Sequence, residues 1–118
     1  MNHRKLVLPE HMNDQGSLFG GYLLKWLDEF AYITASMEFP DHRFVTIAMN
    51  NVEFKHPILC GQILRFGISR ARLGGSSVEY LVEVYGEKSK NVAEPVLFAT
   101  SITFVNLTET GEKKQIRR

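Results

Sequence analysis

The sequence predicts an α+β protein in which one long helix lies on a curved antiparallel sheet. Three observations lead to this prediction. Residues 18–37 carry hydrophobic side chains at spacings of three and four, as a buried α-helix does. After residue 43 the chain alternates hydrophobic and polar side chains, as strands with one solvent-exposed face do. The connections between these strands are short enough for antiparallel pairing.

The predicted helix starts near Ser17, a suitable N-cap, and ends near Glu38, just before a turn at Phe39-Pro40. Its hydrophobic stripe consists of Leu18, Tyr22, Leu23, Trp26, Phe30, Ile33 and Met37. Asp28 lies beside this stripe, in a row whose other members are aliphatic. It is the one charged residue of the helix without an obvious local reason to be there, so it is a candidate functional residue.

Two glycines stand at the start of the helix. Gly20 and Gly21 are poor helix formers, and each costs roughly 1 kcal/mol relative to alanine. Glycines in a first turn leave the free amides uncovered, and these amides form a site for an anion or a polarised carbonyl oxygen. Alternatively, the glycines let the helix start pack tightly. The residues alone leave both interpretations open.

The rest of the chain is predicted to be strands and turns. A short strand is expected within residues 1–9, and the other strands are predicted at residues 43–55, 64–72, 78–85 and 96–105. In the strand at residues 43–55, Val45, Ile47 and Met49 carry the hydrophobic phase first, and Val52 and Phe54 then carry the opposite one. This change predicts a bulge near Asn50-Asn51, and Gly74-Gly75 predicts a hairpin. Residues 1–118 are expected to form a single domain with a polar, solvated and mobile tail from about residue 107.

Composition excludes several classes of protein. A content of 44% hydrophobic and 23% charged residues is ordinary for a globular protein, and a net charge of +1 demands neither nucleic acid nor an anionic membrane. The single cysteine, Cys60, excludes an internal disulfide and fits a reducing cytosol. Lys25, Asp28 and Glu29 argue against a membrane-spanning helix, and residues 1–9, which have no long apolar stretch, are not expected to be a signal peptide. We therefore expect a soluble, cytoplasmic protein, and the scattered histidines predict no metal site.

Several short motifs follow one another in an informative order. They are Asn13, Gly16, Phe19-Gly20-Gly21, Asp28, Val45-Thr46, Phe54-Lys55-His56-Pro57-Ile58 with Gly61, and the segment from Arg72 to Val78. No single motif is specific, but their order and spacing resemble the hotdog-fold acyl-CoA thioesterases, in particular the small bacterial acyl-CoA hydrolases of broad substrate range. The resemblance covers nearly the whole chain. It implies a sheet wrapped around a central helix and subunits joined edge to edge, with active sites at their interface.

The resemblance also implies roles for individual residues. Asp28 matches the catalytic carboxylate, acting as general base on water or as nucleophile on the thioester carbonyl. Asn13 matches the catalytic asparagine, which in the family usually lies across the dimer interface from the aspartate. Gly20 and Gly21 match the glycines whose amides receive the developing oxyanion.

Further residues match the family's substrate path. Thr46 and Tyr22 are candidates for lining the active site, although a strand threonine is more commonly a packing residue. The candidates for binding coenzyme A are Gly74, Gly75, Ser76, Ser77, Arg72 and Lys55. Their ordinary interpretation is a tight hairpin beside a solvated strand face.

The sequence thus predicts an acyl-CoA thioesterase of fatty acid metabolism that uses no metal or redox cofactor. It is expected to be a homodimer at minimum, extended to a tetramer or hexamer. The chain departs from the family pattern at Glu10-His11-Met12, Phe19 and Gln62, which obscures the subfamily and the acyl chain. Two alternatives are a non-catalytic hotdog module that binds or senses acyl-CoA, and a hotdog dehydratase or hydratase. The second generally uses a catalytic histidine, which the helix lacks.

Overall fold

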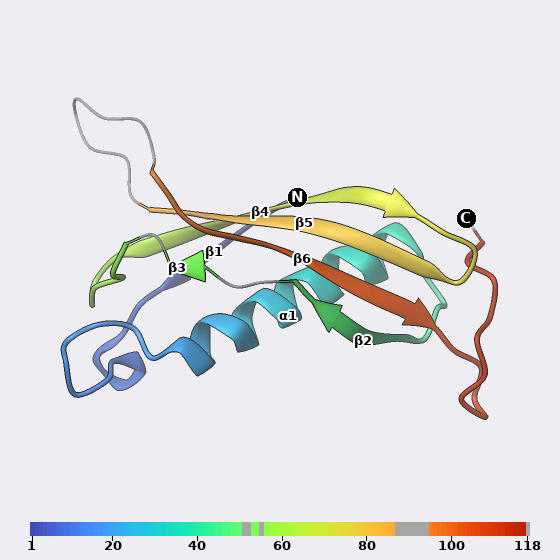
Figure 1. Cartoon of the computed structure of the whole chain (residues 1–118), viewed down its shortest axis with the longest axis horizontal. Coiled ribbons are helices and arrows are strands. Elements are labelled where there is room, and N and C mark those ends of the chain that lie inside the picture. Colours follow the sequence, from blue (N-terminus) through green and yellow to red (C-terminus); the bar gives the residue numbers. More distant parts are fainter. Residues whose placement is uncertain (51–52, 55, 87–94, 118) are drawn as a thin grey trace.

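The computed structural model describes residues 1–50, 53–54, 56–86 and 95–117 (Figure 1). The elements in this part of the chain are β1 (Asn2–Leu6), a 3-10 helix (Pro9–His11), α1 (Gly20–Glu38), β2 (Phe44–Met49), β3 (Glu53–Phe54), β4 (Ile63–Leu73), β5 (Ser77–Tyr85) and β6 (Val96–Asn106). Within these ranges no helix is both long enough and apolar enough to cross a bilayer.

The strands form one antiparallel sheet in the order β1-β4-β5-β6-β2, and β3 pairs with β6. Helix α1 lies along one face of this sheet, as Figure 1 shows. The loop that precedes α1 lies at one end of the molecule, and the C-terminus lies at the other. The predicted α+β fold, with a long helix against a curved antiparallel sheet, is confirmed.

The core lies between the inner face of the sheet and one side of α1. The predicted alternation in β4 and β5 is confirmed, because Phe66, Tyr80 and Val82 are fully buried while their neighbours in sequence are not. Leu23 and Leu27 cover these strands from the helix and are also fully buried. Burial raises the pKa of the Tyr80 hydroxyl, and its 2.7 Å hydrogen bond to Glu38 at the end of α1 raises it further.

The start of α1 differs from the prediction. The helix begins at Gly20, and Phe19 occupies the N-cap position without a side-chain hydrogen bond. Ser17 is therefore not the N-cap. Its side chain instead accepts a hydrogen bond from Asn13 Nδ2 at 3.1 Å, within the loop before the helix. The Ser17 hydroxyl therefore bonds within the loop and does not cap the helix, as the sequence had predicted it would.

The predicted hydrophobic stripe of α1 is only partly buried. Met37 is 63% exposed and Tyr22 is 37% exposed, so both were wrongly placed in the core. The buried side instead includes Ala31 and Ala35, which the sequence placed in the row beside the stripe. Small side chains at these positions let the helix approach the sheet closely.

Strand β2 lies at one edge of the sheet, and its predicted hydrophobic phase was wrong at Val45 and Ile47, although Met49 is partly buried against the core as predicted. Phe44 is buried, whereas Val45 and Ile47 are 39% and 57% exposed. The pairing with β6 becomes irregular between Thr46 and Ala48, earlier than the predicted bulge near Asn50-Asn51. Asn51 lies outside the described residues. Phe44 is buried because its ring packs beside those of Phe39 and Phe104.

The C-terminal segment is not simply solvated, as the sequence predicted from about residue 107. Ile116 belongs to the core, and its amide donates to the Gly75 carbonyl at 2.8 Å. The Lys114 amide donates to the Asn106 carbonyl at 2.9 Å. The Arg117 amide donates to His42 Nε2 at 3.0 Å. One hydrophobic anchor and backbone hydrogen bonds therefore hold a polar sequence against the fold.

Candidate active site

Asp28 projects from the third turn of α1 towards edge strand β2. Its Oδ1 accepts a hydrogen bond from Thr46 Oγ1 at 2.5 Å. Asp28 is partly buried and Thr46 is exposed, so solvent reaches the pair. Among the described residues no hydrogen bond engages Oδ2, which leaves this oxygen to accept a proton or attack a carbon atom.

The amides of Gly20 and Gly21 are also free. Neither donates a hydrogen bond to any residue that the structure describes. A Cβ on Gly21 would lie 3.5 Å from the Phe19 ring, which is an ordinary contact, so packing within this chain does not require glycine there. The free amides and the positive end of the helix dipole can instead stabilise a negative oxygen.

Asn13 organises the loop that leads into α1. Its Oδ1 accepts hydrogen bonds from the Gln15 amide at 2.9 Å and the Ser17 amide at 3.1 Å. The backbone turns back at Gly16, whose φ of 82° favours glycine. Asn13 Nδ2 uses one hydrogen to reach Ser17 Oγ, and its second N–H makes no hydrogen bond within the described part of the chain. Asn13 thus serves as a turn residue and keeps one donor available.

Asp28 and the helix start are separated within one chain. Asp28 follows Gly20 by eight positions in the helix, which corresponds to about 12 Å along the axis. One thioester carbonyl therefore cannot touch both groups of the same protomer, since reacting atoms must approach to roughly 3 Å. The structure places the Asn13 loop with Gly20 and Gly21 at one end of α1, and Asp28 with Thr46 further along it.

Tyr22 lies at the helix start rather than beside Asp28. Its ring centroid is 4.8 Å from that of His11 and 6.0 Å from that of Trp26. Tyr22 is partly exposed, so it can border a ligand that occupies the Gly20 and Gly21 amides.

Except for Lys55, the candidate residues for coenzyme A lie at the β4–β5 hairpin, which the structure confirms as a hairpin. The Gly74 amide donates to the Ser77 carbonyl at 2.8 Å, and the Asn106 amide donates to the Ser76 carbonyl at 2.8 Å. Arg72 and Ser77 share a depression of about 200 Å³ with Glu79 and Thr103. Lys55 lies outside the described residues.

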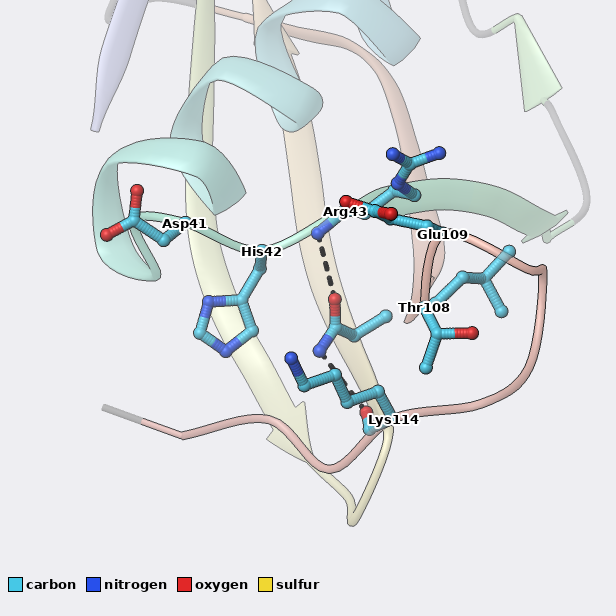
Figure 2. A pocket seen from close by; sticks show the side chains of 8 residues that line it. Asp41, His42, Arg43, Thr108, Glu109 and Lys114 are labelled. Carbon is cyan, nitrogen blue, oxygen red and sulfur yellow. Dashed lines mark hydrogen bonds between the residues drawn. The ribbon is translucent and has the colours of Figure 1, made fainter.

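A separate depression of about 310 Å³ lies beside the C-terminal segment (Figure 2). It is lined by Asp41, His42, Arg43, Asn106, Leu107, Thr108, Glu109 and Lys114. Acidic and basic side chains both border it, so it favours neither anions nor cations. Asn106 closes its floor by accepting from the Arg43 amide at 2.9 Å and donating to the Lys114 carbonyl at 3.3 Å, the two dashed lines of Figure 2.

An antiparallel sheet wrapped around one long helix is the hotdog fold. The family model described as Thioesterase superfamily matches residues 15–93 of this chain. The chain belongs to this family.

Comparison with known proteins gives relatives along nearly the whole chain. An uncharacterized acyl-CoA thioester hydrolase of Haemophilus influenzae is 30% identical over 118 residues, which cover 98% of this chain and 76% of that protein. The acyl-CoA hydrolase of Staphylococcus aureus, solved with butyryl coenzyme A and coenzyme A, has a TM-score of 0.88 at 30% identity, covering 98% of this chain and 70% of that one. A hexameric hotdog fold thioesterase of Campylobacter jejuni has a TM-score of 0.84 at 29% identity, covering 98% and 88% of the two chains.

The Staphylococcus aureus enzyme has also been solved with one asparagine, one aspartate and one threonine each replaced by alanine. Its asparagine precedes its aspartate by 15 positions, and its threonine follows the aspartate by 17. In the present chain Asn13 precedes Asp28 by 15 positions and Thr46 follows it by 18.

Proposed function

We propose that this protein hydrolyses acyl-CoA thioesters to a carboxylic acid and free coenzyme A. The observation that carries the proposal is the Asp28 carboxylate, which is held by Thr46 on one oxygen and free on the other. The family, the coenzyme A complex of the Staphylococcus aureus relative and the shared asparagine–aspartate spacing support it. We expect the enzyme to act in the cytoplasm without a metal or redox cofactor.

Each active site combines two protomers in this proposal. Asp28 of one protomer faces Asn13, Gly20 and Gly21 of the partner, because the separation of about 12 Å along α1 prevents them from meeting within one chain. The homodimer is therefore the smallest active unit. Its hexameric relatives make a hexamer the expected assembly, with a tetramer as the alternative.

The reaction then follows from these groups. The thioester carbonyl oxygen accepts hydrogen bonds from the Gly20 and Gly21 amides, and Asn13 orients the carbonyl or the water through its free N–H. If Asp28 acts as a base, it removes a proton from water while the water oxygen bonds to the carbonyl carbon. The C–S bond then breaks, and the coenzyme A thiolate takes up the proton. If Asp28 acts as a nucleophile, its Oδ2 bonds to the carbonyl carbon and the C–S bond breaks, which releases the coenzyme A thiolate and leaves an anhydride. Water then cleaves the anhydride, and a proton from this water goes to the thiolate.

The test is thiol release from short, medium and long acyl-CoAs by the native protein and by Asp28→Ala and Asn13→Ala, each with its oligomeric state measured. We expect activity to fall by about 10²–10⁴-fold in Asp28→Ala and by about 10²–10³-fold in Asn13→Ala. Measurable binding of acyl-CoA without hydrolysis by the native protein would instead support the sensing module. Water addition to an enoyl-CoA would support the hydratase.

Mixing the two variants tests whether the site is shared. A mixed dimer of Asp28→Ala and Asn13→Ala contains one intact site, because one protomer supplies Asp28 and the other supplies Asn13. Random reassembly of the subunits should restore about a quarter of native activity. Absence of recovery in verified mixed dimers would show that both residues act within one chain.

Isotope labelling separates the two roles of Asp28. In a single turnover in H₂¹⁸O, a general base places ¹⁸O in the released acid. A nucleophile whose anhydride is cleaved by water at the Asp28 carboxyl carbon instead gives the first acid an unlabelled oxygen from Asp28 and leaves ¹⁸O in the enzyme carboxylate.

Coenzyme A is proposed to lie along the hairpin formed by Gly74, Gly75, Ser76 and Ser77, with Arg72 contacting a phosphate. Arg72→Ala should raise KM for an acyl-CoA by about tenfold, the effect of losing one charge-assisted hydrogen bond. The matched control substrate is the same acyl group on N-acetylcysteamine, which lacks the nucleotide. Equal changes in KM for both substrates would contradict this placement.

A further inference from the structure

His11 is a buried histidine that the proposed reaction does not use. It ends the 3-10 helix two residues before Asn13, and its side chain is only 6% exposed. The sequence identified it merely as a departure from the family pattern. In the structure it contacts three separate parts of the chain around the candidate site.

The first two contacts are hydrogen bonds. His11 Nδ1 accepts from the Leu8 amide at 3.0 Å, so in the neutral ring the proton lies on Nε2. The His11 carbonyl accepts from the Phe19 amide at 2.9 Å. The side chain thus sets the turn before the loop, and the backbone closes the loop immediately before Gly20.

The third contact is made by the imidazole ring. Its centroid lies 4.8 Å from that of Tyr22, and it packs edge-on against Trp26, also at 4.8 Å. These two residues belong to the first and second turns of α1. Trp26 is itself buried, so the ring attaches the Asn13 loop to a rigid part of the helix.

We infer that His11 is a positioning residue that holds the Asn13 loop in register with the Gly20 and Gly21 amides. This inference rests on the proposed function, in which these donors act on one thioester. Asn13 is placed by its own loop. Met12 and Leu18 attach this loop to the hydrophobic core, and the His11 ring packs directly on Tyr22 and Trp26 of the helix. Displacing a catalytic group by about 1 Å can reduce a rate by roughly 10²-fold, so the ring contact affects turnover directly.

Two substitutions separate this role from a contribution to folding. His11→Asn keeps an acceptor for the Leu8 amide, since its Oδ1 replaces Nδ1, but it removes the ring. His11→Phe keeps the ring and removes the acceptor. We expect kcat to fall by about tenfold or more in His11→Asn, with KM nearly unchanged and Tm lowered by the cavity that the ring leaves beside Trp26. We expect His11→Phe to lower Tm while keeping kcat within about threefold of the native value. His42→Asn, a matched substitution at the far end of the molecule, should leave kcat unchanged.

The inference predicts strong coupling to Asn13. In the Asn13→Ala background, His11→Asn should cost less than about threefold, because the group that it positions is missing. The inference would be overturned if kcat fell in proportion to Tm in both His11 variants. It would also be overturned if His11→Asn reduced kcat by the same factor with and without Asn13→Ala.

Hydrogen exchange tests the inference without using activity. His11→Asn should speed exchange of the Gln15 and Ser17 amides, which donate to Asn13. Unchanged exchange would overturn the role of His11. A native protein that hydrolyses no acyl-CoA would instead overturn the proposed function, while the exchange measurement would still decide whether His11 orders the loop.

Discussion

Leu27 and Asp28 are neighbours in sequence but lie on different sides of helix α1. Leu27 is fully buried against the sheet, whereas Asp28 is partly buried and accepts a hydrogen bond from edge strand β2. The sheet side of the helix holds the fold together through hydrophobic packing. The other side is free to carry a carboxylate, because water and one hydroxyl satisfy its charge.

The two sides of α1 also differ in how well their hydrophobic side chains are covered. Around Asp28 several hydrophobic side chains remain exposed, namely Leu24, Tyr32, Val45 and Ile47. Exposed apolar surface of this kind costs about 25 cal/mol per Å² relative to burial. A second copy of the chain pairing at the free edge of β2 would cover it, in keeping with the proposed shared active site.

The largest effect is expected from a charge placed on this edge. Ile47→Lys should prevent pairing at β2 and lower kcat/KM by at least about 100-fold, because each proposed site needs both protomers. Light scattering and thiol release would measure the two effects together. Met37→Lys is the matched control, since Met37 is exposed at the end of α1. A fully active Ile47→Lys monomer would contradict the shared site.

The contrast between Leu27 and Asp28 can be measured directly by urea unfolding. Leu27→Ala should reduce the free energy of unfolding by about 2–5 kcal/mol through lost burial and a cavity. Asp28→Asn should change it by less than about 0.5 kcal/mol, although it removes activity under the proposed function. Similar losses of stability in both variants would mean that Asp28 also has a structural role.

A smaller loss of stability is expected at the opposite end of the molecule. Asn106 is buried and joins strand β2 to the C-terminal segment through Arg43 and Lys114. Asn106→Ala leaves those backbone groups without partners and should cost about 1–3 kcal/mol in the free energy of unfolding. Ser69→Ala, at an exposed position of β4, is the control and should change little. Equal stability of the two variants would show that water replaces the Asn106 amide.

The smallest effect concerns pH. Burial lowers the pKa of His3, and the charge of the N-terminal ammonium lowers it further. Below about pH 6.5 the unfolded chain therefore binds more protons at this residue than the folded chain, so stability falls as the pH falls. Tm measured from pH 7.5 to 5 should fall less steeply for His3→Gln than for the native protein. Parallel curves would contradict the lowered pKa.

Much of the fold follows from local patterns. Strands β4 and β5 were predicted with the correct buried faces. In a strand of alternating hydrophobicity every second side chain points to the same face, and the apolar face turns towards the core. The start of α1 was misplaced because Ser17 has a local use in the Asn13 loop. The phase of β2 was also wrong at Val45 and Ile47, which have no partner within the described part of the chain to cover them.

The candidate site was predictable in its parts but not in its arrangement. The order of Asn13, Gly20, Gly21 and Asp28 along the chain pointed to a hydrolase before any geometry was known. Neither the hydrogen bond between Asp28 and Thr46 nor the packing of His11 on the helix could be predicted, because both join elements that are separate in sequence.

The sequence by itself determined the class of fold and the hydrophobic side of most strands, because these depend on side-chain chemistry and periodicity, and its motifs supplied the candidates for the reactive groups. Only the tertiary structure decided that Asp28 and the helix-start amides lie too far apart to act within one chain, and that Ile116 packs into the core. Both outcomes are set by distances between residues remote in sequence, which no local pattern contains.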